Sequence, residues 1–220
     1  YKRQQYRPYR IYNPSSSNTS NQYSNGYTPN KIYYFKYEPL KWRVLDPSAG
    51  LVLCESIIDS QAYSNTVYCY GRDPYDEYDA YWNDAEHTHY ANDYATSSIR
   101  AWLNDDFYNT AFSSSQKASI LTSKLDNRAC STSYSEYDSE TTYDKVFLLS
   151  WSEMQNTAYG FSASTSSSPT RQAKGTDYAK CQGVDVDSSS KCSEQRLRSA
   201  GGISSHACSV YNDGTLHDIG

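Results

Sequence analysis

Hydrophobic and polar positions alternate with a period of two in the first third of the chain, which predicts β-strands. The clearest pair is Leu40–Leu45 and Leu51–Ile58, separated by the turn-forming residues Pro47–Gly50. We therefore expect an antiparallel hairpin here. Its alternation predicts that Trp42 and Val44 face the interior.

Further along the chain the apolar spacing changes to that of a helix. Apolar residues recur every three or four positions in Ile99–Phe107, directly after Ser97, a residue type that caps helix N-termini. Ser113–Gln116 and Ser150–Glu153 each match the capping-box pattern, with a serine followed three positions later by Gln or Glu. These signals predict helix starts at three places.

Two more elements are predicted near the C-terminal end. Ser168 followed by proline suits the opening of a helical stretch, which we expect to end near Gly183. Ala207–Tyr211 and Thr215–Ile219 flank Asn212–Gly214, and an Asn-Asp-Gly turn between apolar runs is a strong hairpin signal.

Composition divides the chain into two parts. Residues 1–37 hold six basic residues and no acidic one, whereas the remainder holds 14 basic and 25 acidic residues, a net charge of −11. The first part is rich in Tyr, Asn and Ser and poor in aliphatic residues, so it cannot bury a core of its own. We expect residues 1–30 to be an extended basic arm and residues 31–220 to be one globular domain.

Four segments in the last two-thirds carry a resemblance to a known family. They are Ser97–Phe112, Asp144–Ser150, Arg171–Gly183 and Leu197–Gly202, followed by the Tyr-Asn-Asp-Gly turn at 211–214. In order and spacing they resemble a large family of secreted bacterial domains with no settled activity. That family has a W-L-N-x-x-F-Y-x-x-A-F helix, a K-x-F-L-L-S strand and a W-W-L-R-S-P-G segment. The resemblance covers roughly residues 38 to 220.

The resemblance implies an α+β fold. The family is distantly like the C-type-lectin-like fold and the formylglycine-generating (sulfatase-modifying) enzymes, so we expect short helices, antiparallel strands and long loops. This sequence departs from the family where Glu194–Arg196 replaces two tryptophans and Ala200 replaces proline. The family's final strand, of the G-V-R-P-A-L kind, has no counterpart before Gly220, which leaves three alternatives: the given residues omit it, the protein ends early, or another strand takes its place.

The six cysteines are widely scattered and include no C-x-x-C pair, which argues against a zinc or thioredoxin-like site. Up to three disulfides in an oxidising compartment is the simpler interpretation. The best candidate pair is Cys192 and Cys208, because both flank Leu197–Gly202 and the chain between them could close into a loop. The other pairings stay open. Together with a start at Tyr1 rather than Met, this predicts an exported, processed protein that is extracellular or at the cell surface.

Candidate ligand-binding residues lie in two loops rich in Tyr, Asp and Asn, which combine ring faces with hydrogen-bonding groups. They are Tyr78, Tyr81, Trp82, Asn83, Tyr211, Asn212 and Asp213. The Trp82-Asn83-Asp84 triplet also occurs in sugar-binding lectins, but on a late strand, so we treat that match as coincidence.

The first of these loops is also acidic and suits calcium, which prefers six to eight oxygen ligands. The candidate calcium ligands are Asp73, Asp76, Asp79 and Asp84. His87 and His89 are a weaker alternative, because imidazoles two positions apart on an extended segment can share a metal. A solvated charged loop is the simpler interpretation of both patterns.

No G-x-S-x-G, Walker or zincin motif occurs, and no catalytic residues are predicted. We expect a non-catalytic binding or adhesion module that presents its loops to a glycan or a surface protein. The alternative is a structural subunit of a filament, in which residues 1–37 dock on the next copy. The alternating Arg and Tyr of the arm would suit nucleic acid, but the acidic pI near 5.3 argues against it. No run is long and apolar enough to span a membrane.

Overall fold

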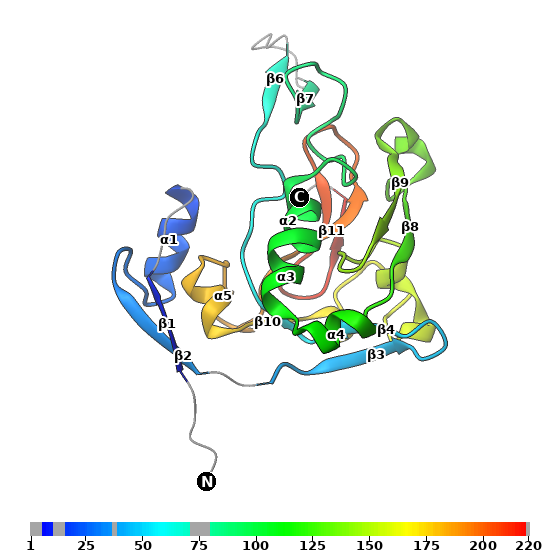
Figure 1. Ribbon diagram of the computed structural model, residues 1–220. Helices are drawn as coiled ribbons and strands as arrows, with labels where there is room; N and C mark the ends of the chain where they lie inside the picture. Colours follow the sequence, from blue (N-terminus) through cyan, green and yellow to red (C-terminus); the bar gives the residue numbers. More distant parts are fainter. Residues whose placement is uncertain (1–5, 11–15, 37–38, 71–79, 219–220) are drawn as a thin grey trace.

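The computed structural model describes residues 6–10, 16–36, 39–70 and 80–218 (Figure 1). It has an α+β fold of short helices and small sheets. The strands are β1 (Tyr6–Arg10), β2 (Ile32–Lys36), β3 (Trp42–Asp46), β4 (Leu51–Cys54), β5 (Ser56–Ile57), β6 (Tyr68–Tyr70), β7 (Ala80–Trp82), β8 (Ser123–Asn127), β9 (Ser139–Asp144), β10 (Lys174–Gly175), β11 (Gln195–Ala200), β12 (Ala207–Val210) and β13 (Leu216–His217). The α-helices are α1 (Ser16–Ser24), α2 (Ser98–Trp102), α3 (Tyr108–Ala111), α4 (Ser114–Ser119) and α5 (Asp177–Cys181).

Shorter helical segments complete the fold. A π-helical turn over Leu103–Phe107 joins α2 to α3, so the predicted amphipathic helix is continuous. Single turns of 3-10 helix lie at Thr132–Tyr137, Glu153–Gln155, Thr157–Tyr159 and Pro169–Arg171. Within the described ranges, no helix is long and apolar enough to cross a membrane.

The sheets are built mostly from strands that are neighbours in sequence. β11, β12 and β13 form a three-stranded antiparallel sheet, and β1–β2, β3–β4, β6–β7 and β8–β9 are antiparallel pairs. The exception is the short parallel pair of β5 with β10. The predicted hairpin around the Asn-Asp-Gly turn is confirmed, with Ser209 opposite His217 and Val210 opposite Leu216.

The first predicted hairpin is also confirmed, but its faces are reversed. β3 pairs with β4, yet Trp42 is 43% exposed and Val44 is 58% exposed, whereas Leu45 in the same strand is buried. The β-bulge between Val44 and Asp46 shifts the register at this point. The neighbouring Arg43 turns inward instead, with its guanidinium 5.0 Å from the ring centre of Phe161.

The core has two parts. The larger is made by Leu45, Leu149, Met154, Phe161, Leu197, Cys208, Val210 and Leu216. The smaller is made by Tyr94, Ile99, Leu103 and Leu125, packed by helix α2 against strand β8. Each part joins segments distant in sequence, and β11 and β12 supply much of the larger one. The sheet β11–β12–β13 is therefore the rigid base for the loops that leave it.

The structure confirms the helix caps predicted at Ser97 and Ser113, but it differs from the prediction for the segment after Ser168. Ser97 caps α2, and Ser113 with Gln116 forms a complete capping box on α4. The single helical stretch expected between Ser168 and Gly183 is instead a 3-10 turn, strand β10 and helix α5. The reason is tertiary: β10 pairs with β5, and Thr176 then provides a new cap for α5.

The N-terminal segment, expected to be an extended arm, contains strand β1 and helix α1. Strand β1 pairs with β2, and the segment packs on α5 (Figure 1). Side-chain amides make the contact. The buried Gln22 donates to the Cys181 carbonyl (2.8 Å), and Asn25 donates to the carbonyls of Lys180 (3.1 Å) and Val184 (2.8 Å). Lys180 and Cys181 lie in the last turn of α5, where carbonyl groups lack the usual helical partner, and Val184 lies just beyond it. Polar side chains of α1 and of the residue after it therefore hold the end of α5.

Candidate functional site

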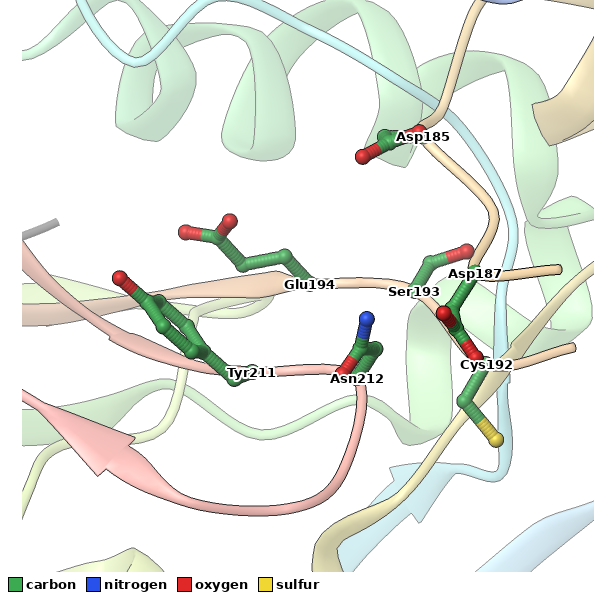
Figure 2. A pocket seen from close by; sticks show the side chains of 7 residues that line it. All are labelled: Asp185, Asp187, Cys192, Ser193, Glu194, Tyr211 and Asn212. Carbon is green, nitrogen blue, oxygen red and sulfur yellow. The ribbon is translucent and has the colours of Figure 1, made fainter. Parts of the chain in front are cut away.

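A small open pocket lies between the 184–194 loop, which precedes β11, and the turn between β12 and β13 (Figure 2). Its volume is about 170 Å³. We call it the acidic pocket, and its lining residues are Asp185, Asp187, Cys192, Ser193, Glu194, Tyr211 and Asn212.

The loop that forms one wall is folded around Asp187. The Asp187 carboxylate accepts hydrogen bonds from the backbone N–H groups of Ser189 (3.1 Å) and Ser190 (2.6 Å) and from the Ser190 hydroxyl (2.8 Å). These bonds favour the ionised form, and the Ser190 N–H contributes most to lowering the pKa of Asp187 below its usual value. The Asp187 carboxylate is thus occupied in shaping the loop.

The opposite wall is the tight turn at the end of β12. The Asp213 carboxylate accepts from the N–H (2.8 Å) and hydroxyl (2.9 Å) of Thr215, and the N–H contact lowers the pKa of Asp213. Gly214 has a positive φ of 83°, and an added Cβ would lie only 1.9 Å from the Ser168 carbonyl oxygen. The turn therefore requires glycine at this position.

The two walls are fixed to the same neighbouring segment, residues 171–173. Gln172 donates from its side-chain amide to the Asn212 carbonyl (3.0 Å), and the Ser193 N–H donates to the Ala173 carbonyl (3.0 Å). Arg171 is buried and donates from Nε to the Gly214 carbonyl (2.7 Å). These bonds hold the loop and the turn at a fixed separation, so the pocket is preformed.

Several polar groups remain unpaired inside the pocket. The side chains of Asp185 and Asn212 make no hydrogen bond to any described residue, and the hydroxyl of the 1% exposed Ser193 lacks a partner there too. Figure 2 shows Asp185 across the pocket from Tyr211 and Asn212, with the Glu194 side chain between Asp185 and Tyr211 and the Cys192 sulfur pointing away. The pocket thus offers carboxylate acceptors and an amide to a ligand.

Two further lining residues have partial partners. Glu194 is ion-paired with Arg196 at 3.2 Å, and both side chains are partly exposed. The Tyr211 ring stacks on His217 with centroids 3.8 Å apart, so one ring face is covered and the ring orientation is fixed. A rigid aromatic ring beside hydrogen-bonding groups is a common arrangement in recognition sites.

A second, larger pocket has a volume of about 320 Å³. One of its lining residues, Arg196, is ion-paired with Glu194 of the acidic pocket. This second pocket is lined by Tyr63, Ser64, Val67, Ala91, Arg196, Ser205 and Ala207. Among the described residues, none of the predicted ligand residues lines it, and Arg196 is the single charged side chain of that lining. We therefore regard the smaller acidic pocket as the better candidate site.

The sequence prediction identified part of this site. Tyr211 and Asn212 line the acidic pocket, whereas Asp213 holds the turn instead of facing the ligand space. The missed lining residues come from the 184–194 loop: Asp185, Asp187, Cys192, Ser193 and Glu194. The acidic side chains of this loop were the available signal, but no local pattern places them beside a turn about 20 residues further along.

The other predicted ligand residues lie in a different region, residues 80–96, which we call the aromatic loop. Trp82 stacks on Tyr90 with centroids 4.3 Å apart, and Tyr90 in turn contacts Tyr137 edge-on. Asn83 donates to the Thr96 hydroxyl (2.8 Å), and the Tyr81 N–H donates to the Ser204 hydroxyl (3.1 Å). Tyr81, Trp82 and Asn83 are thus engaged in internal contacts, and none lines the acidic pocket.

Asp84 also serves the aromatic loop. Its carboxylate accepts from the N–H groups of Thr88 (2.9 Å) and His89 (2.8 Å) and lies 3.1 Å from His89 Nδ1. The Thr88 N–H is the largest cause that lowers the pKa of Asp84. His87 packs near Trp82, so the two histidines have separate partners. Among the described residues no three His, Cys, Asp or Glu side chains form a metal-binding group. The predicted residues Asp73, Asp76, Tyr78 and Asp79 lie outside that part of the chain.

The predicted Cys192–Cys208 disulfide is not formed. Both residues are buried free thiols. Cys192 Sγ is directed to the Ser190 carbonyl at 3.6 Å, whereas the Cys208 thiol donates to the Ala200 carbonyl at 3.4 Å and interacts with Cys130. Positions that flank β11 in the sequence therefore did not identify the cysteine next to Cys208.

Comparison with known proteins gives a family without a described activity. No curated protein and no solved structure matches this chain. Residues 51–220 match a family described as "Domain of unknown function (DUF6273)". The matched region includes both walls of the acidic pocket and the whole aromatic loop, and it leaves β1, α1, β2 and β3 outside. The chain belongs to this domain family of unknown function (DUF6273).

Proposed function

We propose that this protein is a non-catalytic extracellular binding or adhesion module that holds the end of a glycan in the acidic pocket. The observation that carries the proposal is a pair of polar groups between fixed walls, the exposed carboxylate of Asp185 and the amide of Asn212, which have no hydrogen-bond partner among the described residues. Both groups are therefore available to a ligand.

The chemistry of the pocket suits sugar hydroxyls. Each hydroxyl is both a donor and an acceptor, so it can donate to the Asp185 carboxylate and accept from the Asn212 amide. The Tyr211 ring, held by His217, adds a flat apolar surface for the C–H face of a sugar. A protein ligand would use the same groups through a polar or basic side chain.

The size of the pocket limits the ligand. A volume of about 170 Å³ is below the roughly 300 Å³ at which clefts begin to enclose small molecules. We therefore expect the terminal unit of a larger glycan to enter, with the rest outside. Ligand binding by loops agrees with the lectin-like relationship that we propose for the family. Calcium held by Asp73, Asp76, Asp79 and Asp84 remains part of the proposal.

A glycan array with the full chain tests the proposal, with Asp185→Asn as the variant. We expect wild-type binding and a loss of roughly tenfold or more in the variant, because a hydrogen bond to a charged group contributes about 1.5–3 kcal/mol. Asp106→Asn is the matched control, since Asp106 is an exposed carboxylate outside the acidic pocket. An array without hits, together with no detectable protein ligand, contradicts the proposal.

A second candidate function, a filament subunit, has one observation in its favour. The N-terminal segment has a specific docking surface on α5, formed by the contacts of Gln22 and Asn25. The same contacts made between copies would link a homo-polymer through residues 1–37. The solution mass of the full chain and of a chain lacking residues 1–30 tests this. Large assemblies that require residues 1–30 support the filament, and monomers in both samples at all concentrations contradict it.

A further inference from the structure

Cys130 and Cys208 are brought together by the fold although 77 residues lie between them in the sequence. Cys208 is in β12, at the centre of the larger core, and Cys130 follows β8 and packs against the same core. The two thiols interact with each other, and both residues contact the same carbonyl oxygen of β11. A disulfide requires such close placement of two cysteines.

The backbone around the two thiols is fixed by one carbonyl group. The Ala200 carbonyl of β11 accepts from the Cys130 N–H (3.0 Å), and Cys208 Sγ lies 3.4 Å from the same oxygen. Ala200 also pairs with Ala207, the residue before Cys208. The approach of the two cysteines is thus set by the sheet and not by mobile side chains.

We propose that Cys130 and Cys208 are a thiol–disulfide site, which closes to a disulfide that ties the β8–β9 hairpin to the sheet β11–β12–β13. The site is independent of the proposed ligand function.

The two cysteines have different roles in this step. Cys130 is half-buried and reachable, whereas Cys208 is fully buried. The interaction with the Cys208 thiol lowers the pKa of Cys130, and the same interaction together with burial raises the pKa of Cys208. Because the thiolate is the nucleophile, Cys130 attacks first.

The oxidant is a disulfide of a small thiol, such as oxidised glutathione. The Cys130 thiolate attacks one of its sulfurs, forms a mixed disulfide and releases one small-molecule thiolate. Cys208 then loses its proton as its sulfur attacks Cys130 Sγ, and the second small thiol leaves. Two protein thiols and one small disulfide give one protein disulfide and two small thiols.

Peptide mapping of the wild-type full chain tests the site without any variant. The reduced protein is equilibrated in buffers of increasing oxidised-to-reduced glutathione ratio, quenched in acid, alkylated in denaturant and digested with trypsin. Cleavage after Arg128, Lys145, Lys191 and Arg198 places Cys130, Cys192 and Cys208 in three different peptides. We expect the peptides 129–145 and 199–220 to become linked. Linkage of 199–220 to the Cys192 peptide, or alkylated Cys208 at the oxidising end, overturns the proposal.

Variants give a second readout. Wild type should show a higher midpoint of thermal unfolding in the oxidising buffer than in the reducing buffer, because the disulfide restricts the unfolded chain. Cys130→Ser, at the half-buried position, should lose this difference, and Cys192→Ser should keep it. A difference that persists in Cys130→Ser overturns the proposal.

Discussion

The aromatic loop and the acidic pocket have similar compositions but use their side chains in opposite ways. In the aromatic loop, Trp82 stacks on Tyr90 and Asp84 binds backbone N–H groups, so the residues suited to a ligand are engaged within the protein. In the acidic pocket, separate residues shape the walls, and the side chains of Asp185 and Asn212 have no hydrogen-bond partner in the described part of the chain. A loop rich in Tyr, Asp and Asn is therefore not by itself a binding site; what matters is which polar groups the fold leaves without partners.

The largest effect should come from the base under the acidic pocket. Leu197 in β11 is 1% exposed, and Leu197→Ala should lower the free energy of unfolding by about 3 kcal/mol, because it leaves a cavity. Leu121→Ala, at a position 69% exposed, should change it by less than about 0.5 kcal/mol. Urea denaturation measures both. Equal effects in the two variants would show that β11 is not part of the main core.

A smaller stability effect is expected in the aromatic loop. Trp82→Ala removes the ring stacked on Tyr90 and should lower the free energy of unfolding by about 2 kcal/mol. Ligand affinity should stay unchanged, because Trp82 does not line the acidic pocket. Chemical denaturation and a binding titration on the same sample give both values. A loss of affinity without a loss of stability would reverse the roles assigned to the two regions.

The smallest effect concerns pH. The folded-state pKa of Asp187 is lowered, so the hydrogen bonds of its carboxylate stabilise the 187–190 turn above about pH 4, the usual range for an unfolded Asp. That stabilisation is lost as pH falls through the folded-state pKa. We expect ligand binding to weaken in this acidic range before the core unfolds. Asp187→Asn should already bind more weakly at neutral pH, and a wild-type affinity that does not change below pH 4 would contradict this role.

The elements that could be predicted from sequence are those whose determinants are local. The turn at Asn212–Gly214 needs only its own residues and one glycine, and the Ser113 capping box spans four positions. The α+β class, which the family resemblance implied, is confirmed.

The elements that could not be predicted depend on long-range contacts. The acidic pocket exists because Gln172 reaches the Asn212 carbonyl and Ser193 reaches Ala173, contacts that no short pattern encodes. Cys208 likewise lies next to Cys130, a residue distant in sequence. The helix expected after Ser168 is interrupted because β10 pairs with the distant strand β5. The order in the N-terminal segment likewise depends on α5.

The most direct test is a calorimetric titration of the full chain with the glycan that binds most strongly on the array. Wild type, Trp82→Ala and Tyr211→Ala are compared at a temperature where all three are folded. We predict that Tyr211→Ala weakens binding by roughly tenfold or more, as expected for an aromatic contact residue, while Trp82→Ala binds like wild type. Weaker binding in Trp82→Ala with unchanged binding in Tyr211→Ala would contradict the assignment of the ligand site to the acidic pocket.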